Sequence, residues 1–251
     1  MAGHSKWAQI KRKKAVNDAR RGKIFTKLIR EIQVAAKLGG PDEDSNPRLR
    51  QAIQQAKAHN MPMSNIEKAI AKGCGEIEGV NYEEVVYEAY GPAGVAIYIE
   101  VLTDNKNRTV SEIRHILSKY GGNLATSGSV SWMFEKKGTI TVKKNAFSED
   151  DILIIATESG AEDINITEDA YEITTDPSNL ESVKKAFEEK NVPILESAIS
   201  MIPKNTVNVD ENNAQKILSL VETLEDHDDV QKVYANFDID EEILKKVTSS
   251  F

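Results

Sequence analysis

Apolar side chains near the start of the chain recur three and four positions apart, which is the period of an amphipathic helix. Three stretches carry this pattern and are predicted to be helices: residues 17–38, 47–58 and 64–72. Asn46 is a favourable N-cap for the second helix, and Pro47 suits its first turn. Ser64 and Glu67 have the spacing of a capping box for the third helix, which Gly73 ends. The sequence therefore predicts an N-terminal three-helix unit.

After residue 80 the pattern changes to short runs in which apolar and polar residues alternate, as in half-buried strands, separated by helical stretches. Over residues 138–203 the predicted order is strand, helix, strand, strand, helix, strand, which is a complete ferredoxin-like set. Two further strand–helix–strand sets flank it, with strands predicted at 95–101, 130–134, 205–209 and 229–236 and helices at 109–120 and 212–226. These two sets together predict a second ferredoxin-like unit, interrupted by the first.

The predicted fold class is therefore α+β with three domains. An N-terminal three-helix unit is followed by two ferredoxin-like α+β domains, one inserted in the other. The boundaries that we predict are 1–80 for the basic helical domain, 81–137 plus 204–251 for the outer α+β domain, and 138–203 for the inserted α+β domain.

Charge is distributed unevenly along the 251-residue chain, which has a formal net charge of −8. Residues 1–80 contain 16 Lys and Arg against 8 Asp and Glu, whereas the rest of the chain contains 16 against 32. Residues 1–37 alone hold 11 basic side chains and only two acidic ones, Asp18 and Glu31. Such a separation indicates a module that binds a polyanion, attached to an acidic body.

The basic residues near the N-terminus are accompanied by the aromatic side chain of Trp7. Lys and Arg neutralise phosphates and release counterions, and an indole ring stacks on nucleotide bases. Trp7 could equally pack against the first helix, and both interpretations stay open at this point. The second and third helices also have the outline of a helix-turn-helix, although the second is short and most of the basic charge precedes it. The predicted nucleic-acid-binding residues are Lys6, Trp7, Lys11, Arg12, Lys13, Lys14, Arg20, Arg21, Lys23, Lys27, Arg30, Arg48 and Arg50.

The sequence lacks the motifs on which common catalytic and cofactor sites depend. Its four histidines are scattered, and it contains no phosphate-binding loop, dinucleotide fingerprint or serine elbow. We therefore expect a non-enzymatic protein with no catalytic residue, metal ligand, cofactor or small-molecule substrate. The single cysteine, Cys74, fits a reducing compartment, and no apolar run reaches the roughly 18 residues of a membrane span. A cytoplasmic protein with no membrane partner is expected.

Several motifs of this chain resemble, as a set, those of the YebC/PmpR family. The opening decapeptide MAGHSKWAQI is very specific, and the other matching segments are 38–41, 46–50, 60–62, 103–109, 127–134, 160–163 and 233–237. The resemblance covers nearly the whole chain and implies three domains. Members of this family are described as probable DNA-binding transcriptional regulators. Relatives have also been assigned to translation, one as a mitochondrial activator of cytochrome oxidase subunit synthesis and others as ribosome-associated factors that relieve stalling at proline-rich stretches.

These considerations leave three hypotheses for the function. The first, resting on the resemblance, is a DNA-binding transcriptional regulator. The second is a translation factor that binds ribosomal RNA and associates with the ribosome. The chemistry of residues 1–16, which we expect to form a basic arm, fits this hypothesis at least as well, because flexible basic arms with aromatic residues are typical of RNA binding. The third is a protein-binding adaptor that acts through the acidic body. The polar loops 104–109 and 126–129 of that body could recognise a partner, although ordinary turn chemistry explains most of their composition.

Overall fold

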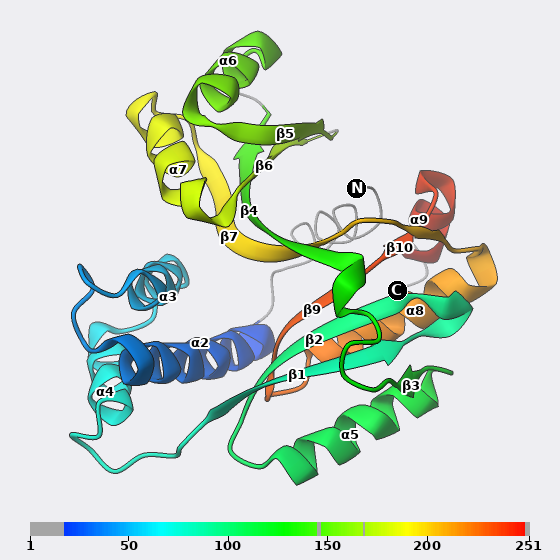
Figure 1. The fold of residues 1–251 in the computed structure, drawn as a ribbon, viewed down its shortest axis with the longest axis horizontal. Coiled ribbons are helices and arrows are strands. Elements are labelled where there is room, and N and C mark those ends of the chain that lie inside the picture. Colours follow the sequence, from blue (N-terminus) through cyan, green and yellow to red (C-terminus); the bar gives the residue numbers. More distant parts are fainter. Residues whose placement is uncertain (1–17, 145–146, 168, 249–251) are drawn as a thin grey trace. The chain divides into compact units, whose positions relative to one another are not determined.

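The computed structural model describes the backbone of residues 18–144, 147–167 and 169–248 and, within these ranges, every side chain except those of 18–21, 241 and 248. The chain divides into two compact units (Figure 1). One unit is the continuous segment Trp132–Thr206, and the other combines Ala2–Ser131 with Val207–Phe251. The predicted division into three domains stays a prediction.

Three helices begin the larger unit: α2 (Asp18–Gly39), α3 (Pro47–Ala58) and α4 (Met63–Gly73). Both shorter helices pack on α2 around one apolar core, whose largest fully buried side chains are Ile32, Leu49, Ile53 and Ile66. Asn46 caps α3 as predicted, because its side chain accepts a hydrogen bond from the N–H of Leu49. The predicted capping box of the third helix is wrong, since Pro62 precedes α4 and no side chain caps that end.

A four-stranded antiparallel sheet follows in the same unit, in the order β3-β1-β2-β9. Its strands are β1 (Glu83–Tyr90), β2 (Ala96–Thr103), β3 (Asn123–Leu124) and β9 (Val230–Ala235). Two helices contribute to the core of the sheet, α5 (Lys106–Lys119) and α8 (Glu211–Glu225), and their apolar residues pack with those of β2 and β9. The remaining elements are the parallel pair β8 (Val207–Asn208) and β10 (Phe237–Asp238), helix α9 (Glu241–Thr248) and the 3₁₀ turn η1 (Pro92–Gly94).

The strands predicted from the sequence differ from this sheet in four places, one of which is the short strand β3, which was not predicted. Strand β1 pairs with β2 along its whole length. It was not predicted, because glutamates next to its core-facing residues give it a polar composition. The strand predicted at 130–134 is wrong, since Ser131–Met133 forms the 3₁₀ turn η2 and the Trp132 side chain is 62% exposed. The strand predicted at 205–209 pairs with β10 and not with the main sheet.

The unit Trp132–Thr206 has the predicted ferredoxin-like order of elements. They are β4 (Phe134–Lys143), α6 (Glu149–Ser159), β5 (Ala161–Ile166), β6 (Ala170–Thr175), η3 (Pro177–Asn179), α7 (Leu180–Glu189) and β7 (Ile194–Pro203). The strands form an antiparallel sheet in the order β5-β6-β4-β7, and Ile140, Ile152 and Phe187 are fully buried in its core. The predicted α+β fold class is confirmed.

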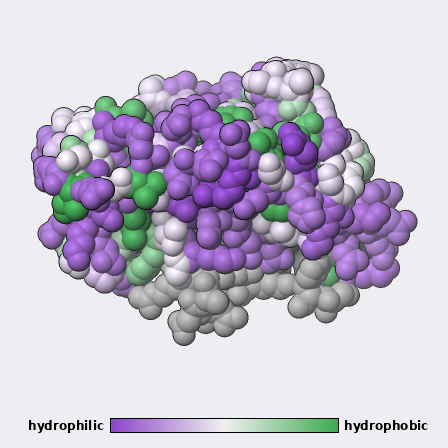
Figure 2. All heavy atoms as spheres, turned by 90° about the horizontal axis from the view of Figure 1, so that it is seen from below, coloured by the Kyte–Doolittle hydropathy of each residue, from purple (hydrophilic) through white to green (hydrophobic). Residues whose placement is uncertain are grey.

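The surface of the described residues is mainly hydrophilic. Figure 2 shows one face on which hydrophilic side chains predominate and apolar ones form small separate groups. The most exposed large apolar side chains of the described residues come from different elements: Leu38, Val80, Trp132, Ile154 and Leu195. No helix among the described residues is both long enough and apolar enough to cross a bilayer.

Candidate nucleic-acid interface

Two of the predicted phosphate-binding lysines on α2 contact the chain's own acidic segment. Lys23 and Lys27 lie four residues apart, on one face of the helix. Both reach the segment Glu225–Asp229, which joins α8 to β9 and which we call the acidic turn. The Lys23 Nζ lies 3.4 Å from a carboxylate oxygen of Asp226, and Lys27 donates a hydrogen bond to the carbonyl oxygen of Glu225.

Arg30, one turn further along the same face, makes deeper contacts. Its Nη1 lies 2.6 Å from Oδ1 of Asp229 and 2.7 Å from the carbonyl oxygen of Asp228, and it reaches the carbonyl of Leu102 at 3.4 Å. The guanidinium group also lies over the ring of Tyr82, 5.1 Å from its centroid. The side chain of Arg30 is only 13% exposed. Arg30 therefore connects α2 to the sheet and is not open to a ligand in this arrangement.

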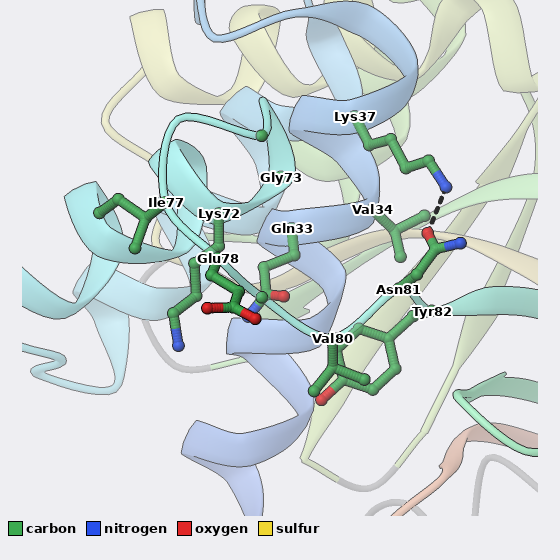
Figure 3. A pocket seen from close by; sticks show the side chains of 12 residues that line it. Gln33, Val34, Lys37, Lys72, Gly73, Ile77, Glu78, Val80, Asn81 and Tyr82 are labelled. Atoms are coloured by element: carbon green, nitrogen blue, oxygen red, sulfur yellow. Dashed lines mark hydrogen bonds between the residues drawn. The ribbon is translucent and has the colours of Figure 1, made fainter.

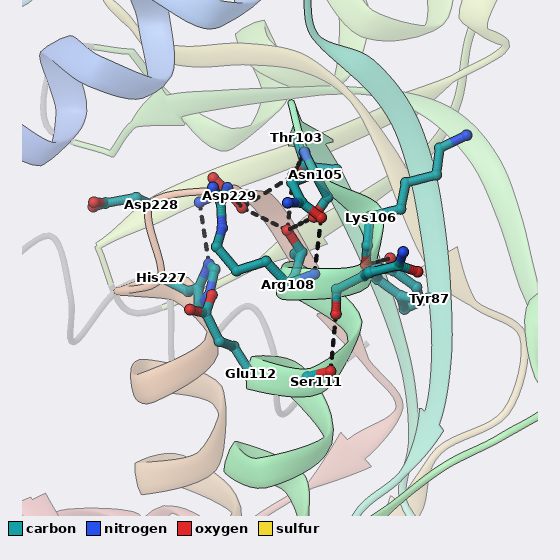
Figure 4. Close-up of polar contacts among 12 residues, drawn as sticks. Tyr87, Thr103, Asn105, Lys106, Arg108, Ser111, Glu112, His227, Asp228 and Asp229 are labelled. Atoms are coloured by element: carbon teal, nitrogen blue, oxygen red, sulfur yellow. Dashed lines mark hydrogen bonds and ion pairs between the residues drawn. The ribbon is translucent and has the colours of Figure 1, made fainter.

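The Asp229 carboxylate is the centre of a buried polar cluster (Figure 4). The residue is 2% exposed, and its second oxygen accepts hydrogen bonds from Thr109 at 2.6 Å, Arg108 at 2.7 Å and Thr103 at 3.1 Å. Burial by itself would raise the pKa of this carboxyl group. Hydrogen bonds from Thr109, Arg108 and Arg30 outweigh that effect and lower the pKa of Asp229 to about 2. The group is therefore a carboxylate at neutral pH.

The motif Thr103–Thr109 supplies most of this cluster. Asn105 caps α5 by accepting a hydrogen bond from the N–H of Arg108, and the helix begins three residues before the predicted Thr109. Thr109 is then buried and faces Asp229. The cluster was missed from the sequence because Asp229 lies more than 100 positions from its partners. The presence of this motif in the family resemblance was the one signal pointing to it.

His227 lies beside the cluster and links the acidic turn to α5. Its Nε2 is 2.8 Å from a carboxylate oxygen of Glu112, and its Nδ1 accepts a hydrogen bond from the N–H of Asp229. This pattern places the proton of the neutral ring on Nε2. Glu112, His227 and Asp229 are close enough together to hold a metal ion. Each already has a partner, and the guanidinium groups on Asp229 would repel a cation, so we assign no metal to them.

The remaining predicted residues fall into three groups. Among the described residues, Arg48 is held between Glu31 at 2.7 Å and Glu84 at 2.6 Å, whereas Arg50 donates to the carbonyl oxygens of Glu43 and Asp44. Only the backbone of α2 is described at two further positions, Arg20 and Arg21. The rest lie outside the described residues: Lys6, Trp7, Lys11, Arg12, Lys13 and Lys14.

A second buried carboxylate, that of Glu88, organises the polar loop before Trp132. It accepts hydrogen bonds from the backbone N–H groups of Gly128 at 2.7 Å, Val130 at 2.6 Å and Ser131 at 2.9 Å. Burial by itself would raise the pKa of Glu88, but these three hydrogen bonds lower it. Three backbone N–H groups of the loop thus converge on one buried carboxylate, an arrangement that was not predicted from the sequence.

A shallow pocket of about 350 Å³ lies between α2, the end of α4 and the linker that follows (Figure 3). Lys37 and Lys72 line it from the two helices, and Lys37 donates a hydrogen bond to the side chain of Asn81. A Cβ on Gly73 would lie 2.3 Å from the carbonyl oxygen of Gln33, so the close packing of α4 on α2 requires glycine there. None of the predicted nucleic-acid-binding residues lines this pocket.

Comparison with known proteins places the chain in a family. The model described as the TACO1/YebC protein N-terminal domain matches residues 5–76, and the model of the TACO1/YebC second and third domain matches residues 82–237. This chain belongs to the TACO1/YebC family. The resemblance predicted from its motifs is thereby confirmed.

Similar members of the TACO1/YebC family match this chain end to end. Two of them carry the name "Probable transcriptional regulatory protein". The protein from Syntrophus aciditrophicus is 55% identical, and the match covers 99% of this chain and 100% of that protein. The protein from Sulfurihydrogenibium sp. is 57% identical, and the match covers 98% of this chain and 99% of that protein. A crystal structure of the conserved hypothetical protein Aq1575 from Aquifex aeolicus is 54% identical, with a TM-score of 0.84, covering 90% of this chain and 94% of that one. The names of the two relatives from Syntrophus aciditrophicus and Sulfurihydrogenibium sp. support a regulatory role.

Proposed function

We propose that this protein is a non-enzymatic, DNA-binding transcriptional regulator whose N-terminal cations contact the phosphate backbone. The supporting observation is the excess of basic over acidic side chains near the N-terminus, before the cations of α2 that have partners within the chain. The described cations of α2 have partners within the chain, whereas residues 1–21 hold seven Lys and Arg and a single acidic side chain, Asp18. Cations in such excess attract a polyanion, and releasing condensed counterions from DNA favours binding.

The proposal makes a quantitative prediction about salt. If about six to eight phosphates are contacted, the logarithm of the affinity falls with the logarithm of salt concentration at a slope of roughly −5 to −7 for duplex DNA. Replacing Lys11, Arg12, Lys13 and Lys14 together by alanine is expected to flatten that slope by roughly three to four units. Fluorescence anisotropy with a labelled duplex between 50 and about 300 mM salt measures the slope.

A second quadruple variant controls for net charge. Lys143, Lys185, Lys190 and Lys216 are exposed and lie in the acidic body, so their replacement by alanine removes the same charge from another place. It is expected to leave the slope within about one unit of the wild-type value. If both variants flatten the slope equally, the N-terminal region is not the main contact.

An RNA-binding translation factor is the second candidate, favoured by the position of Trp7 among the N-terminal cations. An aromatic ring beside lysines suits unpaired bases, which duplex DNA does not expose. Competition decides between the two: the protein is equilibrated with ribosomes and duplex fragments at physiological salt and separated by sedimentation. Sedimentation with ribosomes that is lost on deletion of residues 1–14 would support the translation factor. Retention on the duplex would support the transcriptional regulator. Binding that is insensitive to salt, or that survives the deletion, would favour a protein-binding adaptor.

A further inference from the structure

The helical part and the sheet of the larger unit have separate apolar cores. The first contains Ile32, Leu49 and Ile53, the second is built on the strands with α5 and α8, and no described residue belongs to both. The described contacts from α2 to the acidic turn are polar, made by Lys23, Lys27 and Arg30. Cationic side chains therefore hold α2 against this turn through two ion pairs and through hydrogen bonds to backbone carbonyl oxygens, and such contacts, unlike apolar burial, can be exchanged for contacts with another anion.

The strength of these contacts is graded along the helix. The Lys23–Asp226 pair is 3.4 Å long, and its side chains are 45% and 52% exposed. Exposed pairs of this kind contribute little and are screened by salt. The pair between Arg30 and Asp229 is short and buried, and Asp229 is held by further hydrogen bonds from the sheet. The contact is therefore weak at the N-terminal end of α2 and strong at Arg30.

We propose that the acidic turn Glu225–Asp229 is an internal competitor for nucleic acid. In the arrangement described here it occupies the cationic face of α2, as a phosphate backbone would. When nucleic acid binds, phosphates displace the turn from Lys23 and Lys27, while the Arg30–Asp229 pair stays closed and keeps α2 attached to the sheet. This inference rests on the proposed function and adds a form of regulation to it. In the free protein, the acidic turn occupies Lys23 and Lys27, so these two cations are available to nucleic acid only after the turn is displaced.

The competition has a physical basis in the chemistry of the two anions. The acidic turn carries four carboxylates in five residues, at Glu225, Asp226, Asp228 and Asp229. Duplex DNA carries a denser line of charge, and its binding also releases condensed counterions, which the exchange of an internal pair does not. A phosphate backbone brought to α2 by the preceding cations therefore gains by replacing the exposed end of the turn.

Zero-length carbodiimide crosslinking tests the displacement directly. It joins an amine to a carboxylate that are in contact, so Lys23 and Asp226 give a defined crosslinked peptide in the free protein. Lys106 and Glu83 form a second ion pair in the same unit and provide the internal control. Binding of a labelled duplex is measured in the same samples. We expect saturating duplex to reduce the Lys23–Asp226 crosslink by at least about fivefold and to leave the Lys106–Glu83 crosslink unchanged.

The other outcomes are separable. If duplex binds and the Lys23–Asp226 crosslink persists at its original yield, the inference is overturned and the proposed function stands. If neither duplex nor ribosomal RNA binds, the proposed function fails, and the inference fails with it.

A matched pair of variants provides a second readout. Asp226→Asn removes the partner of Lys23, whereas Asp228→Asn removes the same charge from the same turn but no described side-chain pair. Figure 4 shows the Asp228 side chain pointing away from the buried cluster. D226N is expected to bind duplex about threefold more tightly than D228N at 50 mM salt, and the difference is expected to vanish near 0.5 M. Equal affinities at low salt would mean that the turn acts only through net charge and would overturn the competition.

Discussion

The carboxylate of Asp229 accepts hydrogen bonds from four side chains that come from three separate parts of the chain. Breaking a buried ion pair by removing one partner leaves the other charge uncompensated, at a cost of roughly 3–5 kcal/mol. Asp229→Asn keeps the shape of the side chain but removes its charge. It is expected to lower the free energy of unfolding by about 3 kcal/mol in urea titrations. Asp228→Asn, one residue earlier and exposed, is the control and is expected to change stability by less than about 0.5 kcal/mol.

The same residue sets a pH dependence. The pKa of Asp229 is lowered from 3.8 to about 2 in the folded protein. A carboxyl group whose folded pKa is depressed stabilises the fold above its unfolded pKa, and this contribution is lost as the pH falls through the folded pKa. The stability difference between the wild type and D229N is therefore expected to be constant from pH 7 to about 5, and to shrink between pH 3.8 and about 2. A difference that changes mainly near neutral pH would contradict this assignment.

Glu88 makes a different residue-scale prediction, because three of its hydrogen bonds come from backbone N–H groups. Hydrogen bonds to a charged acceptor contribute roughly 1.5–3 kcal/mol each, more than those to a neutral amide. Glu88→Gln is expected to accelerate amide hydrogen exchange at Gly128, Val130 and Ser131 by at least about tenfold. Tyr90→Phe, which removes one hydroxyl hydrogen bond to the carbonyl of Ser129, is the control and should have a smaller effect. Equal protection in wild type and E88Q would show that the loop is held by other contacts.

At the scale of elements, two helical glycines test the packing of the N-terminal helices. A Cβ on Gly73 would lie 2.3 Å from the backbone of α2, whereas a Cβ on Gly22 would meet nothing within 4 Å. Alanine is favoured over glycine in a helix by about 1 kcal/mol. Gly22→Ala is therefore expected to raise the melting temperature, and Gly73→Ala to lower it by several degrees because α4 must move off α2. Calorimetry of the two single variants measures both, and a stabilised G73A would show that α4 tolerates the shift.

The elements also show which parts of the molecule could be predicted from the sequence. The three N-terminal helices were predicted to within two residues, because each combines a clear apolar period with a proline or glycine signal at one end. Strand β1 was missed because its three glutamates give it a polar composition that obscures its core-facing positions, Val85, Tyr87 and Ala89. The prediction at 130–134 failed because Val130 and Phe134 are buried as their alternation suggested, whereas Trp132 between them lies in the 3₁₀ turn η2 and is exposed.

The candidate site was harder to predict than the fold, because it depends on contacts between residues that lie far apart in the sequence. The basic excess could be counted from the sequence, but the partners of the cations could not, because Arg30 and Asp229 lie 199 positions apart. Which cations remain available to a ligand depends on such pairings. Lys23, Lys27 and Arg30 were predicted as phosphate contacts from their charge alone, and whether they contact a nucleic acid stays a prediction.

At the scale of the whole larger unit, the separate cores predict a response to salt in the absence of any ligand. Raising the ionic strength screens the exposed pair of Lys23 and Asp226, whereas the part-buried hydrogen bond of Lys27 and the buried pair of Arg30 are screened much less. Between 0.05 and 0.5 M NaCl, amide exchange is expected to rise about two- to fivefold in the first turns of α2 and in the acidic turn. Peptides of β4, β6 and β7 should exchange at the same rate at both salt concentrations, because their protection comes from one ferredoxin-like core. Unchanged exchange across the acidic turn would show that α2 is held there by something other than charge, and a nucleic acid would then have no electrostatic means of displacing it.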